Sequence, residues 1–157
     1  MEFMTGVKTT DLLELAKLQN KELIGQTVKV NGAVHTIRDM GDVAFVVLRK
    51  RDGLLQCVYE EGKSGFDLKD LKEACTVEVE GILNEEQRAP GGIEVRIRGI
   101  KILSTPSPPM PLPIAKWKLN TSLEAKLNIR SVSLRNVRER ARFRIQEGIV
   151  RGFRDFL

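Results

Sequence analysis

The chain has 157 residues, of which 41% are hydrophobic and 30% are charged, and its formal net charge is +5. This length accommodates one ordinary hydrophobic core and a smaller appendage. No apolar run approaches the roughly 20 residues that a membrane-spanning helix needs, and the first residues lack the basic flank and apolar centre of a secretory signal, so we expect a cytoplasmic protein.

The first segment with a regular pattern is TTDLLELAKL, residues 9–18. Its leucines recur near helical spacing, and Thr10 or Asp11 can cap the first turn, which predicts a short amphipathic helix. Three alternating or apolar runs follow, and each predicts a strand: residues 26–34, 42–49 and 54–59. The Asp-Gly step between the last two is typical of a hairpin turn.

The pattern then changes to helical spacing and returns to alternation. In residues 66–75 four apolar side chains share one helical face: Phe66, Leu68, Leu71 and Ala74. Residues 76–83 and 92–103 alternate again and predict two more strands. Five strands with a helix between the third and fourth predict a mainly β fold, the five-stranded OB-fold barrel, with an N-terminal helix and a C-terminal helical extension. A sandwich of unrelated topology uses similar strands.

Five of the six prolines lie between Thr105 and Pro113, where the fixed φ of proline favours an extended connector. We therefore expect three parts in the chain. They are an OB-fold domain at residues 1–104, a proline-rich hinge or linker at residues 105–132, and the start of a second domain at residues 133–157.

The C-terminal segment is helix-prone and carries the whole basic excess. Residues 1–113 have 15 basic and 17 acidic side chains, whereas residues 114–157 have 11 basic and four acidic ones. Ser133 is the candidate cap of the last helix. An apolar stripe on that helix cannot be buried within one helix and favours docking on further chain or on a partner: Ile145, Ile149, Val150, Phe153 and Leu157.

Neither the cysteines nor the histidine form a recognisable reactive site. Cys57 and Cys75 lack the spacing of a zinc or redox site, and we expect both to be reduced core residues. His35 has no Ser, Cys or acidic partner at catalytic spacing, so a structural or exposed position is expected. The sequence therefore predicts neither a catalytic residue nor a metal site in this chain.

Two residues in the second and third predicted strands are candidates for contact with a nucleic acid. Single-stranded bases are held by stacking on an exposed aromatic ring and are told apart by hydrogen bonds to their edges. Phe45 shares a strand face with Val43 and Val47, but the opposite face is also apolar, so either face can be the core. Gln56 interrupts an apolar strand with an amide that donates and accepts, although an exposed strand position is the simpler alternative.

Two charged residues extend this set of candidates. Arg38 precedes a Gly-containing turn, from which a guanidinium can reach a phosphate or a base edge. Glu94 begins the polar face of the last strand, where a carboxylate can accept hydrogen bonds from a base amino group. Each is also compatible with an ordinary solvated position, so neither identifies a site alone.

Together these residues resemble a known family. The run VNGAVHTIRDMGDVAFVVLRKRDGLLQCVYE is similar to the first three strands of the class II aspartyl-, asparaginyl- and lysyl-type tRNA synthetases. By this resemblance Phe45 stacks on the central anticodon base and Gln56 hydrogen-bonds it. In the aspartyl branch, Arg38 and Glu94 correspond to further anticodon contacts. The sequence departs from the pattern at Ala33 and Thr36, where family members often have an aromatic and a basic residue.

The resemblance continues through the C-terminal segment. FRIQ and the ending FRDFL resemble the lead-in to motif 1 of these enzymes, which implies that residues 133–157 begin a class II catalytic domain and are truncated within motif 1. The helix there forms much of the homodimer interface in the family, which assigns four of the stripe residues to it: Ile145, Ile149, Val150 and Phe153. FRIQ and LPI favour the archaeal and eukaryotic style of aspartyl enzyme.

The resemblance implies that this is the N-terminal domain of an aspartate–tRNA ligase and that it recognises the anticodon. The partner is then the tRNA for aspartate, and in a non-discriminating enzyme also the tRNA for asparagine. The motifs that bind ATP are absent from these residues, so this chain alone should be inactive, and ATP and magnesium are expected only for the catalytic domain. Three alternatives remain open. They are an asparaginyl-type anticodon domain, a generic single-strand-binding barrel and a protein-interaction barrel.

Overall fold

In this computed structural model, residues 9–10, 18, 21–51, 53–106 and 108–157 are described. The chain divides into two compact units, Met1–Pro108 and Pro109–Leu157. The three-part division with a linker at 105–132 stays a prediction. Among the described residues, no helix is both long and apolar enough to cross a membrane.

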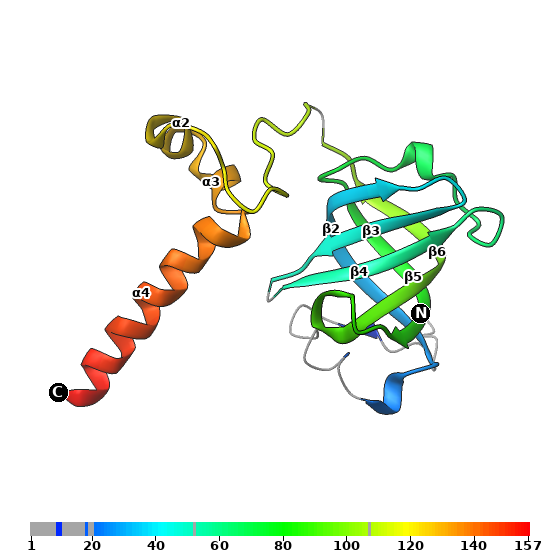
Figure 1. The fold of residues 1–157 in the computed structure, drawn as a ribbon, viewed down its shortest axis with the longest axis horizontal. Helices are drawn as coiled ribbons and strands as arrows, with labels where there is room; N and C mark the ends of the chain where they lie inside the picture. Colours follow the sequence, from blue (N-terminus) through cyan, green and yellow to red (C-terminus); the bar gives the residue numbers. More distant parts are fainter. Residues whose placement is uncertain (1–8, 11–17, 19–20, 52, 107) are drawn as a thin grey trace, which may run out of the picture. The chain divides into compact units, whose positions relative to one another are not determined.

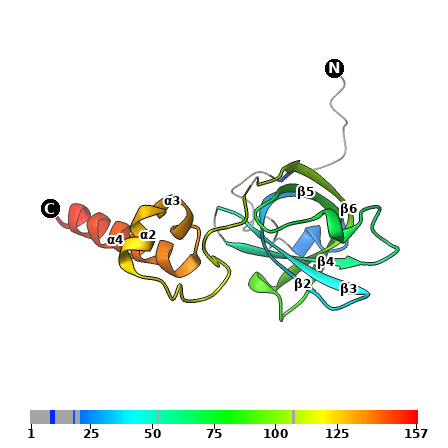
Figure 2. The same ribbon diagram turned by 90° about the horizontal axis from the view of Figure 1, so that it is seen from above.

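Five strands of the first unit curl into a closed barrel (Figure 1; Figure 2). Their bounds are β2 Thr27–Asp39, β3 Val43–Arg49, β4 Leu54–Glu60, β5 Thr76–Glu85 and β6 Ile93–Ser104. The strands are ordered β2-β3-β4-β6-β5, and β2 also pairs with β5 and so closes the sheet. All these pairings are antiparallel except that of β4 with β6, which is parallel. The prediction of a five-stranded OB-fold barrel is confirmed.

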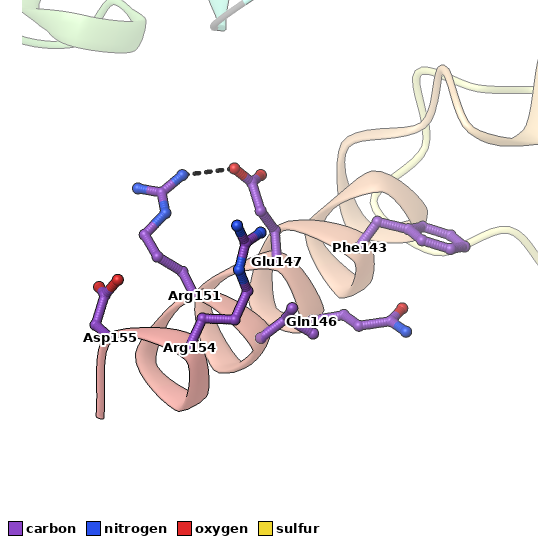
Figure 3. Close-up of a pocket in the computed structure, with 7 residues that line it drawn as sticks. Phe143, Gln146, Glu147, Arg151, Arg154 and Asp155 are labelled. Atoms are coloured by element: carbon purple, nitrogen blue, oxygen red, sulfur yellow. Dashed lines mark hydrogen bonds and ion pairs between the residues drawn. The ribbon is translucent and has the colours of Figure 1, made fainter. Parts of the chain in front are cut away.

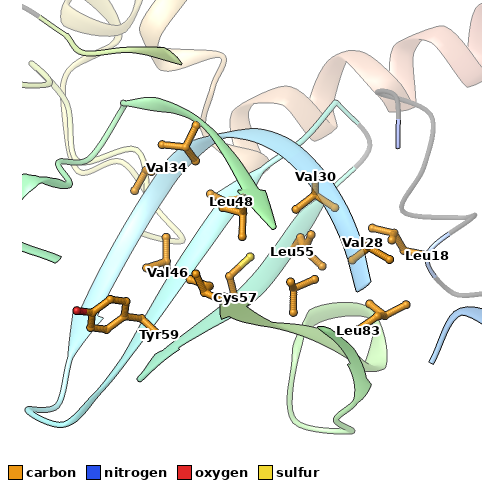
Figure 4. Close-up of a cluster of buried hydrophobic side chains, with 14 of the residues drawn as sticks. Leu18, Val28, Val30, Val34, Val46, Leu48, Leu55, Cys57, Tyr59 and Leu83 are labelled. Atoms are coloured by element: carbon orange, nitrogen blue, oxygen red, sulfur yellow. The ribbon is translucent and has the colours of Figure 1, made fainter. Parts of the chain in front are cut away.

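The barrel interior is filled by alternate side chains from every strand (Figure 4). In β3, Ala44, Val46 and Leu48 are fully buried in this core, whereas Phe45 lies on the other face and is half-buried. The choice that the sequence left open is therefore settled, since successive residues of a strand face opposite sides. Most of the remaining interior is aliphatic: Val28, Val30, Leu55, Val77, Val79, Leu83 and Val95.

The expected N-terminal helix lies largely outside the described residues. Of its segment, Thr9–Thr10 form the short strand β1, which pairs in parallel with β2, and Leu18 is fully buried in the barrel core. A 3-10 turn, η1 Lys21–Leu23, leads into β2.

The helix predicted over residues 66–75 is wrong in extent. Only the single 3-10 turn η2, Leu68–Asp70, is helical, and a second 3-10 turn, η3 Pro90–Gly92, precedes β6. The cause is a pair of backbone hydrogen bonds to Val34, whose N–H donates to the carbonyl of Cys75 and whose carbonyl accepts from Ala74. These bonds pull the chain into strand pairing, and Ala74 takes a φ of 68°.

A bulge in β2 displaces His35 from the ladder. Val34 pairs with Leu48 and Thr36 with Val47, so one residue of β2 has no opposite partner. His35 is buried, and its burial, followed by the nearby charge of Arg49, lowers the pKa of the imidazole. The expectation of a structural position for His35 agrees with this burial.

The second unit holds three helices, α2 Leu123–Asn128, α3 Arg130–Ser133 and α4 Val137–Phe156. The predicted cap of the last helix, Ser133, is wrong: Ser133 ends α3, and Asn136 caps α4 by accepting from the N–H groups of Arg138 and Glu139. The Asn136 amide nitrogen also donates to the carbonyls of Ile114 (2.9 Å) and Lys116 (2.7 Å). One buried side chain therefore starts the helix and fastens the preceding segment to it.

Both cysteines are free and buried, as predicted. Burial raises the pKa of Cys57 to about 12. We therefore expect Cys57 to resist iodoacetamide at pH 8 in the native protein, with a thiolate fraction about a thousandfold below that of an ordinary thiol. Mass spectrometry of the Cys57 peptide, labelled with and without guanidinium, measures this. Rapid labelling of the native protein would show that the core opens at this position.

Candidate nucleic-acid interface

The four predicted binding residues of the barrel lie on one face of the sheet, outside the core. Paired residues on neighbouring strands face the same side, so the register places side chains in rows across the sheet. One row runs through Arg38, Phe45, Val58 and Arg96, and the next runs through Thr36, Val47, Gln56 and Glu94. We call these eight residues the outer platform.

The centre of the outer platform is apolar. Phe45 lies between Arg38 on β2 and Val58 on β4, and its ring is only half-buried. Val47 and Val58 beside it are 2% and 8% exposed although they point away from the barrel core. The centre of the platform is therefore aliphatic beside a partly exposed ring, and such a ring can stack on a flat partner.

Gln56 and Glu94 form a direct side-chain pair. They are opposite each other in the parallel β4–β6 pairing, and Nε2 of Gln56 donates to Oε2 of Glu94 over 3.2 Å. Both residues are nearly buried, at 9% and 7% exposure. Nε of Arg96 lies 3.9 Å from Oε1 of the same carboxylate, and its side chain is 61% exposed.

Arg38 is exposed near the end of β2, directly before a tight turn. Oδ1 of Asp39 accepts from the N–H of Gly41 at 2.9 Å, and Gly41 takes a φ of 92° that favours glycine. The N–H of Met40 donates to the carbonyl of Val43 over 3.0 Å. The turn thus holds Arg38 beside the ring of Phe45 without restricting the guanidinium itself.

Arg96, Val47 and Val58 belong to the outer platform but were not singled out from the sequence. The alternation of residues 92–103 places Arg96 on the same strand face as Glu94, so the sequence pattern alone predicts that Arg96 belongs to the platform. In the sequence, Val47 and Val58 cannot be distinguished from core residues, because an apolar residue on the outer face of a barrel strand has the same chemical character as one in the core.

The arrangement has the parts needed to hold a single-stranded nucleotide. A partly exposed ring can stack on a base, a nearby amide and carboxylate can hydrogen-bond its edge, and flanking guanidinium groups can contact phosphates. A pair of buried hydrogen-bonding groups beside a stacking ring discriminates between bases, because a mismatched base leaves those groups unsatisfied.

The residues assigned to a dimer interface lie in the other unit, on α4. Ile145, Ile149, Val150 and Phe153 are 50–67% exposed. Figure 3 shows side chains of α4 that line a pocket next to this stripe, and Val150 of the stripe is one of the lining residues. Arg151 pairs with Glu147 in this pocket over 2.7 Å. The described part of the second unit does not cover this stripe.

Comparison with known proteins identifies relatives of the chain. Residues 28–103 match the OB-fold nucleic acid binding domain of the tRNA anticodon family. The chain is 40% identical to Aspartate–tRNA(Asp/Asn) ligase of Deinococcus radiodurans over 133 residues, which cover 85% of this chain and 29% of that protein. It is 34% identical to the enzyme of the same name from Saccharolobus solfataricus, over 88% of this chain and 32% of that protein.

Among solved structures, asparaginyl-tRNA synthetase from Pyrococcus horikoshii is similar, with a TM-score of 0.71 and 28% identity. The similarity covers 87% of this chain and 32% of that one. The chain thus spans about a third of the length of the relatives that it matches.

Proposed function

We infer that this chain, which belongs to the tRNA anticodon family of OB-fold nucleic acid binding domains, reads the anticodon of an aspartate-accepting tRNA with its outer platform. One observation is the main support for this proposal. The ring of Phe45 faces away from the core, beside the buried Gln56–Glu94 pair, so stacking and edge recognition can act on the same base.

The proposed roles follow from position on the outer platform. Phe45 stacks on the central anticodon base and Gln56 hydrogen-bonds the edge of that base. Arg38, one strand away, and Glu94 contact the anticodon from either side of the ring. The local charge from Arg38 and Arg96 favours the phosphates of the loop, which matters because the barrel region has no basic excess.

The whole protein is proposed to be an aspartate–tRNA ligase that acts in the cytoplasm, and this chain supplies its recognition part. By its relatives' names the acceptor is tRNA for aspartate, or both aspartate and asparagine tRNAs. We assign the ATP and magnesium of the reaction to a catalytic domain and no catalytic residue to this chain, which should be inactive by itself. The exposed apolar stripe of α4 is proposed to pair with a second copy in the full-length enzyme.

Titration with anticodon stem-loops tests the recognition proposal. A fluorescent stem-loop with the anticodon GUC should bind at least about tenfold more tightly than loops with another central base, because a good bidentate contact contributes about 1–3 kcal/mol of discrimination. This ratio should persist between 50 and 200 mM salt, whereas total affinity falls. Equal affinity for all four central bases would indicate a generic single-strand binder, and absence of binding would indicate a protein-interaction barrel.

A further inference from the structure

The orientation of the Gln56 amide is fixed from one side only. Its nitrogen donates to Oε2 of Glu94 at 3.2 Å, and among the described residues this is the only hydrogen bond of the Gln56 side chain. An amide group can turn over by exchanging the places of its oxygen and nitrogen, and the two forms present opposite hydrogen-bonding patterns. The partner at position 94 therefore decides which pattern the outer platform presents.

A carboxylate allows only one of the two forms. An ionised glutamate accepts hydrogen bonds and donates none, so the amide nitrogen must face Glu94 and the amide oxygen must face away. The inverted form would place two acceptors against each other in a nearly buried position, which is strongly disfavoured.

The carboxylate itself is held in place. Gln56 and Glu94 are paired in the β4–β6 register, so their backbones fix the approach of the two side chains. Nε of Arg96 lies near the second oxygen of the Glu94 carboxylate. In the orientation in which the Asn84 amide nitrogen donates to the carbonyl of Leu83, the Asn84 amide oxygen accepts from the same Nε of Arg96 at 3.1 Å. Glu94 thus has a defined position before any ligand binds.

We propose that Glu94, in addition to its proposed contact with the anticodon, is a positioning residue that holds the Gln56 amide in the one orientation that accepts uracil and rejects cytosine. This inference rests on the proposed anticodon function. The edge of uracil presents the N3–H donor beside a carbonyl acceptor, which complements the Gln56 oxygen and its second N–H. The edge of cytosine presents N3 as an acceptor beside an amino donor, which complements only the inverted amide.

The test is Glu94→Gln, titrated with two stem-loops that differ only in the central base, GUC and GCC. A glutamine at position 94 can donate or accept, so it supports both orientations of Gln56. Relative to the unaltered chain, the variant should lose about threefold in affinity for the uracil loop and gain about threefold or more for the cytosine loop. Glu85→Gln removes the same charge from an exposed position on β5 and should leave the ratio unchanged.

The gain for cytosine is the decisive readout, because damage to the barrel would weaken both loops together. Glu94→Gln with the original uracil preference, or with an equal loss for both loops, would overturn the inference and leave anticodon recognition standing. An unaltered chain without any base preference would instead overturn the proposed function.

NMR of the free, unaltered chain gives a second check that requires no folded variant. One side-chain N–H of Gln56 should be protected from hydrogen exchange by Glu94. Equal, rapid exchange of both N–H protons would contradict the fixed orientation.

Discussion

Replacing Gly81 with alanine should destabilise the barrel severely. A Cβ atom at this position would lie 2.1 Å from the carbonyl oxygen of Arg96 and 2.7 Å from Cγ1 of Val95, both on the neighbouring strand β6. Separations below 3 Å are far inside van der Waals contact, and the closer atom belongs to the backbone, which cannot move aside as a side chain can.

The strain at Gly81 cannot be relieved locally. The residue lies at a register shift of the β5–β6 pairing, where Glu80 is opposite Gly99 and Gly81 is opposite Ile97. On its other side β5 pairs with β2, where Gly81 is opposite Val28, so the strand is held from both edges. Overpacking of a core costs about 1–3 kcal/mol, and we expect the upper end or more here, a large part of a total stability of about 5–15 kcal/mol.

Urea unfolding followed by circular dichroism measures this effect. Gly99→Ala is the matched control, because a Cβ at Gly99 on β6 would meet no atom within 4 Å. The midpoint should fall by more than about 1 M urea for Gly81→Ala, given a slope of about 1–3 kcal/mol per M, and should change little for Gly99→Ala. Similar midpoints for the two variants would show that β5 and β6 do not approach each other this closely.

The same contact connects the stability of the barrel to its outer face. The carbonyl group that lies closest to Gly81 belongs to Arg96, which is two residues after Glu94 on β6. A displacement of β6 would therefore also displace Glu94, which pairs with Gln56. Loss of RNA binding in Gly81→Ala would therefore report unfolding or displacement of β6. A variant that removes a base contact must instead retain the unfolding midpoint of the unaltered chain.

The strands were predictable because alternation depends only on neighbouring residues. The extent of the segment at residues 66–75 was not, since two hydrogen bonds to Val34, about 40 residues earlier, override its helical spacing. Likewise, Ser133 looked like a cap, but Asn136 alone also reaches the carbonyls of Ile114 and Lys116. Local patterns do not contain these distant partners.

The candidate site shows the same division. The family resemblance selected Phe45, Gln56, Arg38 and Glu94, and the β-sheet register brings all four to one face. Periodicity alone could not orient Phe45, because Val47 makes the outer face of β3 apolar as well. The hydrogen bond between Gln56 and Glu94 joins residues 38 positions apart through a parallel pairing, which no spacing in the sequence reveals.

Replacing Phe45 with alanine should weaken binding of the GUC stem-loop by about 10- to 100-fold, because stacking of one base on an aromatic ring contributes about 1–3 kcal/mol. The loss should affect loops with any central base, since every base has a flat face. This pattern differs from that expected at Glu94, where the ratio between bases changes.

The size of the effect follows from the partial exposure of the Phe45 ring and from its position outside the core. Phe45 is partly exposed on the face opposite the core, so its removal leaves the inner core of Ala44, Val46 and Leu48 intact but takes away the surface proposed to receive the base. Phe45→Tyr retains a ring and should lose less than about threefold. Phe45→Leu retains apolar bulk without a ring and should resemble alanine.

Fluorescence anisotropy of the labelled loop measures the affinities, and urea unfolding of each variant identifies any general loss of structure. Leu103→Ala, which shortens an exposed apolar side chain of β6 outside the outer platform, is the control for a change of surface hydrophobicity. Binding that survives in Phe45→Ala, or that Leu restores as well as Tyr does, would mean that no base stacks on this ring. The recognition surface of the barrel would then have to lie elsewhere.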